Sequence, residues 1–157
     1  MALLLARRLE WASTDLDREI ERHAGKALAG IFEEEGEERF RDLESRALAE
    51  ALDGKEPVVV ACGGGVLGRE ENRRLLRAHA HVVWLTVDPE EAAARLGEES
   101  SARPLLRAGP VAELLGELLN RRERAYAAAA NATVDTGGSP PEEVAERIAS
   151  MVARLRV

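Results

Sequence analysis

Two aspartates near the start of the chain are spaced for work on a metal-bound phosphate or a hydroxyl group. Asp15 and Asp17 are separated by Leu16 alone. If a strand runs through them, both carboxylates share one face and could serve a hydrated Mg²⁺ and a substrate hydroxyl. The alternative is that Asp17 caps a helix that begins at Arg18.

Arg41 and Glu44 form the second candidate pair. They lie three residues apart in a segment with helical patterning, so their side chains are neighbours. One interpretation is a planar guanidinium that receives a substrate carboxylate and is oriented by its glutamate. The other is an ion pair on an exposed helix face, worth about 0.2–0.5 kcal/mol.

A glycine triplet is the third candidate. Gly63, Gly64 and Gly65 follow the apolar run 58–61 and precede a charged helical segment. Without Cβ atoms, their backbone can approach a ligand closely. The neighbouring Cys62 is expected to be a small buried residue.

Two further arginines suit an anionic ligand. Arg103 lies in the loop 97–109, which has the length and composition of a functional lid, although most loop arginines are solvated. Arg122 competes with Arg121 and Arg124, and an arginine-rich solvated helix face is the alternative. The chain holds no GxxxxGK[ST] phosphate loop.

The elements that must position these residues alternate between strands and helices. This alternation predicts an α/β fold with a mainly parallel sheet, in one domain over residues 1–157. Strands are expected at 11–14, 57–61, 81–87 and 132–135. Helices are expected at 2–10, 17–24, 27–35, 37–52, 69–78 and 88–96, from 110 onward, and from about 139 to the end.

Composition limits the possible functions. The 157 residues carry a net charge of −7, with 45% hydrophobic and 32% charged residues. The acidic balance argues against nucleic acid or an anionic membrane as partner. The sequence shows no signal peptide and no bilayer-spanning stretch, so a monomeric cytoplasmic enzyme or binding domain is expected.

The order of the motifs carries more information than any one of them. The segments DLDREIERHAG, IFEEEGEERFRDLE, VVVACGGGV, ARPLL, R-x3-Y and TVDT cover nearly the whole chain. In this order the chain resembles shikimate kinases, which belong to the P-loop small-molecule kinases. The resemblance implies a three-layer fold of the nucleoside-monophosphate-kinase type. It also implies phosphoryl transfer from ATP to the 3-hydroxyl of shikimate, in the route to aromatic amino acids, with Mg²⁺ as cofactor.

The resemblance also implies a role for each candidate in the substrate site. Asp15 corresponds to the aspartate near Mg²⁺ and Asp17 to the one that contacts the shikimate hydroxyls and acts in catalysis. Arg41 and Arg122 match the arginines that hold the shikimate carboxylate. Glu44 matches the acidic residue that supports them.

The remaining roles concern the pocket wall and ATP. Gly63, Gly64 and Gly65 match the glycines that line the shikimate pocket. Arg103 matches the catalytic lid arginine that reaches the ATP phosphates, and Arg95 is expected to flank adenine. The stretch that ends in Pro141 resembles the adenine loop.

The chain departs from the family at its N-terminus. In the family order 2-3-1-4-5, the first strand and its GxxGxGKST loop precede the helix equivalent to 2–10, and neither occurs here. We expect impaired activity, and favour a mis-assigned start codon or a truncated gene over an evolved pseudoenzyme. The alternatives are a non-catalytic shikimate-binding protein and another P-loop metabolite kinase, such as a gluconate-type enzyme.

Overall fold

Parallel strands alternate with helices along the chain, as the sequence predicts. The computed structural model describes residues 1–97, 106 and 109–155. The elements are α1 (Ala2–Leu9), β1 (Ala12–Asp15), α2 (Leu16–Ala24), α3 (Leu28–Leu52), β2 (Val58–Ala61), the short 3₁₀ helix η1 (Val66–Gly68), α4 (Glu70–His79), β3 (Val83–Thr86), α5 (Pro89–Leu96), α6 (Val111–Ala129), β4 (Ala132–Asp135) and α7 (Pro141–Leu155).

The strands form two separate parallel pairs. In the first, Ala12 of β1 lies opposite Val58 of β2, and in the second, Val83 of β3 lies opposite Ala132 of β4. Each pair is a two-stranded sheet, and among the described residues no ladder joins β2 to β3. This arrangement fits the family order with its central strand left out, as the sequence predicts.

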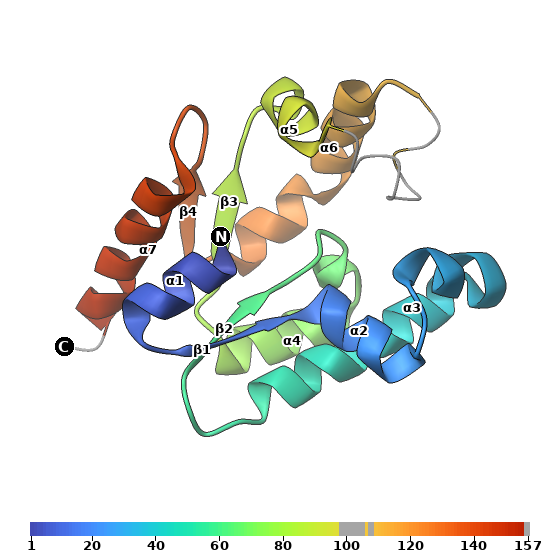
Figure 1. Cartoon of the computed structure of the whole chain (residues 1–157), viewed down its shortest axis with the longest axis horizontal. Helices are drawn as coiled ribbons and strands as arrows, with labels where there is room; N and C mark the ends of the chain where they lie inside the picture. Colours follow the sequence, from blue (N-terminus) through green and yellow to red (C-terminus); the bar gives the residue numbers. More distant parts are fainter. Residues whose placement is uncertain (98–105, 107–108, 156–157) are drawn as a thin grey trace.

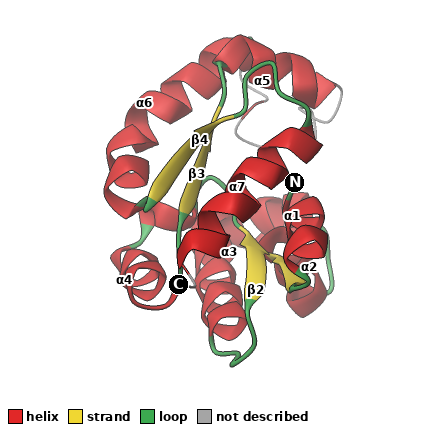
Figure 2. Cartoon of the chain, turned by 90° about the vertical axis from the view of Figure 1, so that its left-hand side faces the viewer, coloured by secondary structure: helices red, strands yellow, loops and turns green. Residues whose placement is uncertain are grey.

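Helices cover both faces of the strands, giving three layers. On one face α1 packs beside α7, and their core includes Leu5, Val144 and Ile148. On the other face α2, α3, α4 and α6 share a second core that includes Ile20 and Leu48. Figure 1 shows α1 beside α7, away from α2, α3 and α4, and Figure 2 shows α6 and α7 on opposite sides of β3 and β4.

Two glycines set the course of the chain before the site. Gly25 closes α2 in the left-handed region, with φ 67°, and its N–H bonds to the carbonyl of Glu21. Gly36 interrupts α3 with φ 82° and ψ 171°, so residues 28–35 and 37–52 are helical segments that meet at a kink. The sequence predicts separate helices on either side of both positions, and both breaks are confirmed.

A groove separates β2 from β3. Its volume is about 800 Å³, and its walls include both strands together with residues of α1, α3 and α7. The groove therefore lies where a strand between the two sheets would lie.

Candidate functional site

The glycine triplet lies directly after β2 in a tight turn. The N–H of Val66 bonds to the carbonyl of Gly63 at 3.2 Å, and the N–H of Gly68 bonds to that of Gly65 at 2.9 Å. A Cβ on Gly65 would overlap the guanidinium of Arg41. Any residue with a Cβ here would therefore displace the Arg41 guanidinium from this position.

The other two glycines meet the remaining predicted site residues. A Cβ on Gly64 would lie 3.0 Å from Nη1 of Arg122, and one on Gly63 would lie 3.4 Å from Oδ1 of Asp17 and 3.6 Å from Oε1 of Glu44. Side chains from α2, α3 and α6 thus converge on one short turn. The structure brings together all the residues predicted to bind the substrate.

Arg41 and Glu44 form an ion pair within the site. Nη1 of Arg41 donates to Oε2 of Glu44 at 2.8 Å, while Nη2 donates to Oε1 of Glu37 at 3.0 Å. The side chain of Arg41 is 12% exposed and that of Glu44 is 2% exposed. The ion pair is therefore real, but the exposed helix face expected in the simpler interpretation is wrong, since the pair faces the glycine turn.

Burial affects the pKa values of both members of this pair. Burial raises the pKa of Glu44 and nearby Asp17 adds to this, against the opposing effect of Arg41 and Arg122. Burial disfavours the charged form of Arg41 as well, but the hydrogen bonds to Glu44 and Glu37 outweigh it and raise its pKa. Arg41 therefore stays a cation and Glu44 is held as its acceptor.

Asp15, rather than Asp17, caps the helix. Strand β1 ends at Asp15, whose Oδ1 accepts hydrogen bonds from the N–H groups of Asp17 and Arg18 at 3.0 and 3.4 Å. The two aspartates therefore do not share a strand face, and Asp17 is not the cap, because the strand ends at Asp15 and the helix begins one residue before Asp17. As a result Asp17 lies in the first helical turn, beside Gly63.

Arg122 is distinguished from its neighbours by position on α6. Arg121 is 74% exposed and pairs with Glu117 in its own helix, and Arg124 is also exposed. Arg122 is half-buried against Gly64. The prediction that Arg122 faces the site, and that its neighbours face solvent, agrees with this placement.

Tyr126 is a site residue that the sequence analysis assigns no role. Its hydroxyl donates to the carbonyl of Gly64 at 2.5 Å, and its ring lies 5.5 Å from that of Trp84. Tyr126 therefore ties the glycine turn after β2 to strand β3. The R-x3-Y spacing in the sequence could have identified Tyr126 as a site residue, because it places the tyrosine one helical turn after Arg122.

Arg95, predicted to flank adenine, lies at the end of the other strand pair. Arg95 of α5 donates to Oγ1 and the carbonyl of Thr136, at 3.1 and 2.7 Å. Thr136 follows β4 and precedes Pro141, the first residue of α7. Arg95 thus borders the loop predicted to receive adenine.

Part of the predicted site lies outside the described residues. Arg103 and nearly all of the predicted lid 97–109 lie outside them. Within the described ranges, no group of three or more His, Cys, Asp or Glu side chains could hold a metal ion by itself.

No helix in that part of the chain is long and apolar enough to cross a membrane.

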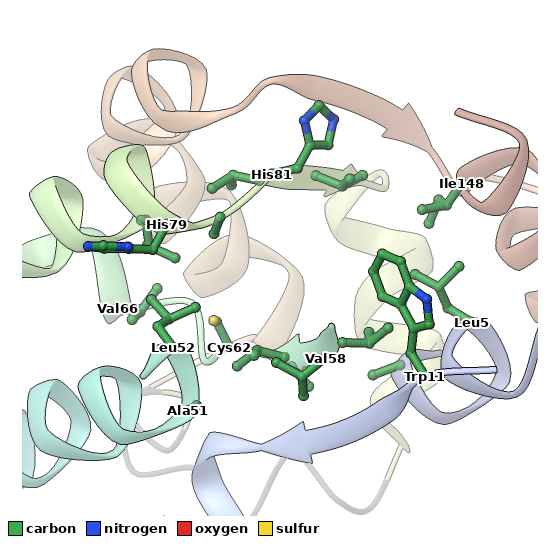
Figure 3. A pocket seen from close by; sticks show the side chains of 18 of the residues that line it. Leu5, Trp11, Ala51, Leu52, Val58, Cys62, Val66, His79, His81 and Ile148 are labelled. Atoms are coloured by element: carbon green, nitrogen blue, oxygen red, sulfur yellow. The ribbon is translucent and has the colours of Figure 1, made fainter. Parts of the chain in front are cut away.

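Cys62 corrects one expectation. It is exposed rather than buried, because its side chain borders the groove between β2 and β3 (Figure 3). Desolvation by surrounding protein atoms, followed by the negative charges of Glu44, Asp17 and Asp15, raises the pKa of the thiol to about 12. The thiol is thus protonated at neutral pH.

Comparisons with known proteins agree with this site. The sequence profile of the shikimate kinase family matches residues 1–153. The shikimate kinase of Thermobifida fusca is 48% identical over 145 residues, which cover 92% of this chain and 82% of that protein. That of Gloeobacter violaceus is 44% identical over 152 residues, covering 97% and 84%.

A solved structure shows the same fold. The shikimate kinase from Acinetobacter baumannii, in complex with shikimate, superimposes with a TM-score of 0.93 at 31% identity. The match covers 99% of this chain and 86% of that one. The predicted α/β fold is confirmed, and the gluconate-type alternative receives no support from these relatives. The chain belongs to the shikimate kinase family.

Proposed function

We propose that this protein is a shikimate kinase whose substrate site is the turn Gly63–Gly65 with the side chains around it. The observation that carries this proposal is the convergence of two guanidinium groups, from Arg41 and Arg122, and two carboxyl groups, from Asp17 and Glu44, on three consecutive glycines. The reaction transfers the γ-phosphoryl group of ATP to the 3-hydroxyl of shikimate. The compartment is the cytoplasm and the enzyme acts as a monomer.

The two arginines account for recognition of the acid. Arg41 and Arg122 both lie against the glycine turn, from α3 and α6. Guanidinium groups bind carboxylates through charge-assisted hydrogen bonds, which are stronger than neutral ones. Glu44 and Glu37 hold the Arg41 side chain from the side of α3, so the arginine is oriented before the substrate arrives.

Asp17 is placed to act on a substrate hydroxyl. Its carboxylate lies beside Gly63 at the beginning of α2. In phosphoryl transfer the protein contributes chiefly by positioning and by stabilising charge, and a carboxylate that accepts the hydroxyl proton orients the nucleophile. Arg103 of the lid would meet the transferring group.

Asp15 fits a magnesium ion that is bound largely by phosphates and water. Both of its helix-cap bonds go to Oδ1, so the helix does not require the second oxygen. Mg²⁺ in kinases takes one or two carboxylates and keeps several waters, so one aspartate is compatible with this mode of binding. When bound, the ion neutralises charge on the phosphates.

The proposed ATP site is less complete than the proposed shikimate site. Arg95 and Pro141 border the proposed adenine site, but the 157 residues contain no lysine–hydroxyl phosphate loop. The lysine and loop amides of such a motif cradle the β- and γ-phosphates. We therefore expect the 157-residue polypeptide alone to bind shikimate without measurable phosphorylation, which keeps a non-catalytic binder as the second candidate.

Calorimetry with two ligands tests the substrate class. Shikimate and its neutral methyl ester are titrated into the 157-residue polypeptide, and ADP release is followed separately. We expect the ester to bind about tenfold to hundredfold more weakly, because it removes the partner of both arginines. Equal binding of acid and ester would overturn the proposed site. Sustained, shikimate-dependent ADP release would contradict the expected loss of turnover.

A further inference from the structure

The turn after β2 is rich in glycine and depends on other groups for its shape. Residues 63–68 read GGGVLG, with four glycines in six positions. Glycine loses more backbone freedom on folding than any other residue, so such a segment keeps one conformation only where other groups hold it. Because Arg41 and Arg122 lie against this turn, the groups that hold it also set the geometry of the proposed shikimate site.

Every carbonyl group of this turn accepts a hydrogen bond. Two of these bonds run within the turn, and the carbonyl of Gly64 accepts from Tyr126 of α6. The other three carbonyls, at residues 66–68, accept from side chains of α4. The turn is therefore held by two helices, and α4 provides three of the six bonds.

Asn72 of α4 makes a hydrogen bond to this turn that is out of reach of solvent. Its Nδ2 donates to the carbonyl of Val66 at 2.9 Å, and Asn72 is 0% exposed. Arg73 donates to the carbonyls of Leu67 and Gly68 at 2.6 and 3.2 Å, but its side chain is 27% exposed. When a buried donor is removed, water does not readily replace it, so its acceptor is left unpaired. Asn72 is therefore the α4 residue whose bond to the turn is hardest to replace.

The other end of the Asn72 amide indicates that packing alone does not account for this residue. Its Oδ1 is buried and has no hydrogen-bond partner among the described residues. A buried acceptor without a partner costs free energy, whereas an apolar side chain of similar size avoids that cost. Leu76, one helical turn further along α4, belongs to the adjacent hydrophobic core. Leucine would therefore suit position 72 as well, if packing were its only role.

We propose that Asn72 is a positioning residue for shikimate. Through the carbonyl of Val66 it fixes the glycine turn where Arg41 and Arg122 can share one substrate carboxylate. The inference rests on the proposed function, because it assigns that carboxylate to the two arginines. Asn72 acts through the backbone of the turn and is not itself a substrate ligand. Its contribution therefore belongs to the affinity for shikimate more than to the stability of the fold.

Asn72→Leu tests the proposal, because leucine keeps the approximate size of the side chain and removes its donor. Shikimate is titrated by calorimetry into the folded 157-residue polypeptide and its variants. We expect Asn72→Leu to bind shikimate about threefold to tenfold more weakly, which corresponds to the loss of one hydrogen bond. Without shikimate, the N–H groups of Val66 and Gly68, which close the turn, should exchange with solvent faster in this variant.

Leu76→Val is the matched control on the same face of α4. Leu76 is 6% exposed, so valine removes a buried methylene group without removing a hydrogen bond. We expect this variant to unfold at a lower urea concentration than the wild type while its affinity for shikimate stays unchanged. If Asn72→Leu does not fold, Asn72→Ala replaces it, since alanine also removes the donor and should weaken binding in the same way.

Three results would overturn the inference. They are wild-type affinity for shikimate in the folded Asn72 variant, unchanged amide exchange at Val66 and Gly68 in that variant, and an equal loss of affinity in Leu76→Val. Failure of the proposed function looks different, because the wild type would then bind shikimate and its methyl ester equally. That result overturns both proposals, whereas a wild type that prefers the acid, with an Asn72 variant that binds it equally well, overturns this inference alone.

Discussion

Glu44 is the residue that links the charge of the site to the protein's interior. It is 2% exposed and accepts a hydrogen bond from Arg41 at 2.8 Å. A buried carboxylate of this kind is tolerated because it is paired, and removal of one partner leaves the other charge unmatched. Glu44 thus positions Arg41 while remaining out of reach of solvent.

The raised pKa of Glu44 gives a pH dependence with a defined sign. The folded protein holds this proton more tightly than the unfolded chain, so the associated stability is complete below the ordinary value of 4.5 and is lost as pH rises through the raised pKa. We expect the free energy of unfolding of the wild type, minus that of Glu44→Gln, to fall as the pH rises above the ordinary value of 4.5. Urea denaturation across this range measures the difference.

Glu50 supplies a control of opposite sign. The hydrogen bond from Arg46 lowers its pKa, so its stability contribution is present above the ordinary value and is lost as pH falls. The difference between wild type and Glu50→Gln should therefore rise with pH. A difference for Glu44→Gln that stays constant or rises would show that burial does not dominate at this residue.

The spacing of residues in the sequence predicted which side chains pair, but it did not predict how deeply those side chains are buried. The three-residue separation of Arg41 and Glu44 predicts their ion pair, but the pair lies against a glycine turn that comes much later in the chain, at Gly63 to Gly65. The assignment of the helix cap to Asp17 failed by two residues, because the helix begins directly after Asp15. Local patterns do not decide where a strand ends and a helix begins.

At the scale of elements, the kink in α3 carries Arg41 and Glu44 to the site. The helix runs from Leu28 to Leu52 and is broken at Gly36, whose φ of 82° and ψ of 171° belong to a region that only glycine adopts readily. The second half, after the kink, holds both site residues. The helix thus changes direction because of the backbone conformation of Gly36.

Substitution of Gly36 should reveal that dependence. No atom lies within 4 Å of a Cβ built on Gly36, so Gly36→Ala is opposed by backbone conformation alone. We expect a loss of about 1–3 kcal/mol in the free energy of unfolding. Gly30→Ala is the matched control, because Gly30 lies in the same helix without a positive φ and its Cβ would make only ordinary contacts. That variant should be neutral or slightly stabilising. Equal losses in urea unfolding would contradict the kink's role.

The course of the elements was largely predictable from pattern. Strands expected at 57–61 and 81–87 are found at Val58–Ala61 and Val83–Thr86, because apolar runs between turn residues are strong local signals. The exposure of Cys62 was not predictable in the same way. It follows from the groove, and the groove depends on which strands are neighbours.

At the scale of the whole molecule, two halves contribute different parts of the site. The strand pair β1–β2 leads into the glycine turn, with Asp17 and Arg41 around it, while β3–β4 leads to Thr136 and Arg95. The groove separates the halves, and Tyr126 spans them through Gly64 and Trp84. The order of the motifs predicted the family. It did not predict the contacts of Tyr126 with Gly64 and Trp84, because contacts between distant segments form only in the folded chain.

Shikimate titration of four alanine variants tests the central claim most directly. Arg41→Ala and Arg122→Ala each remove a charged donor at the glycine turn, whereas Arg121→Ala and Arg124→Ala remove arginines that α6 exposes to solvent. Circular dichroism first establishes that each variant is folded.

By calorimetry, we expect the first two variants to bind shikimate about tenfold to hundredfold more weakly than the wild type, because the substrate carboxylate loses a charge-assisted partner. The two controls should bind as the wild type does. Equal, small effects in all four folded variants would contradict the assignment of this turn as the shikimate site.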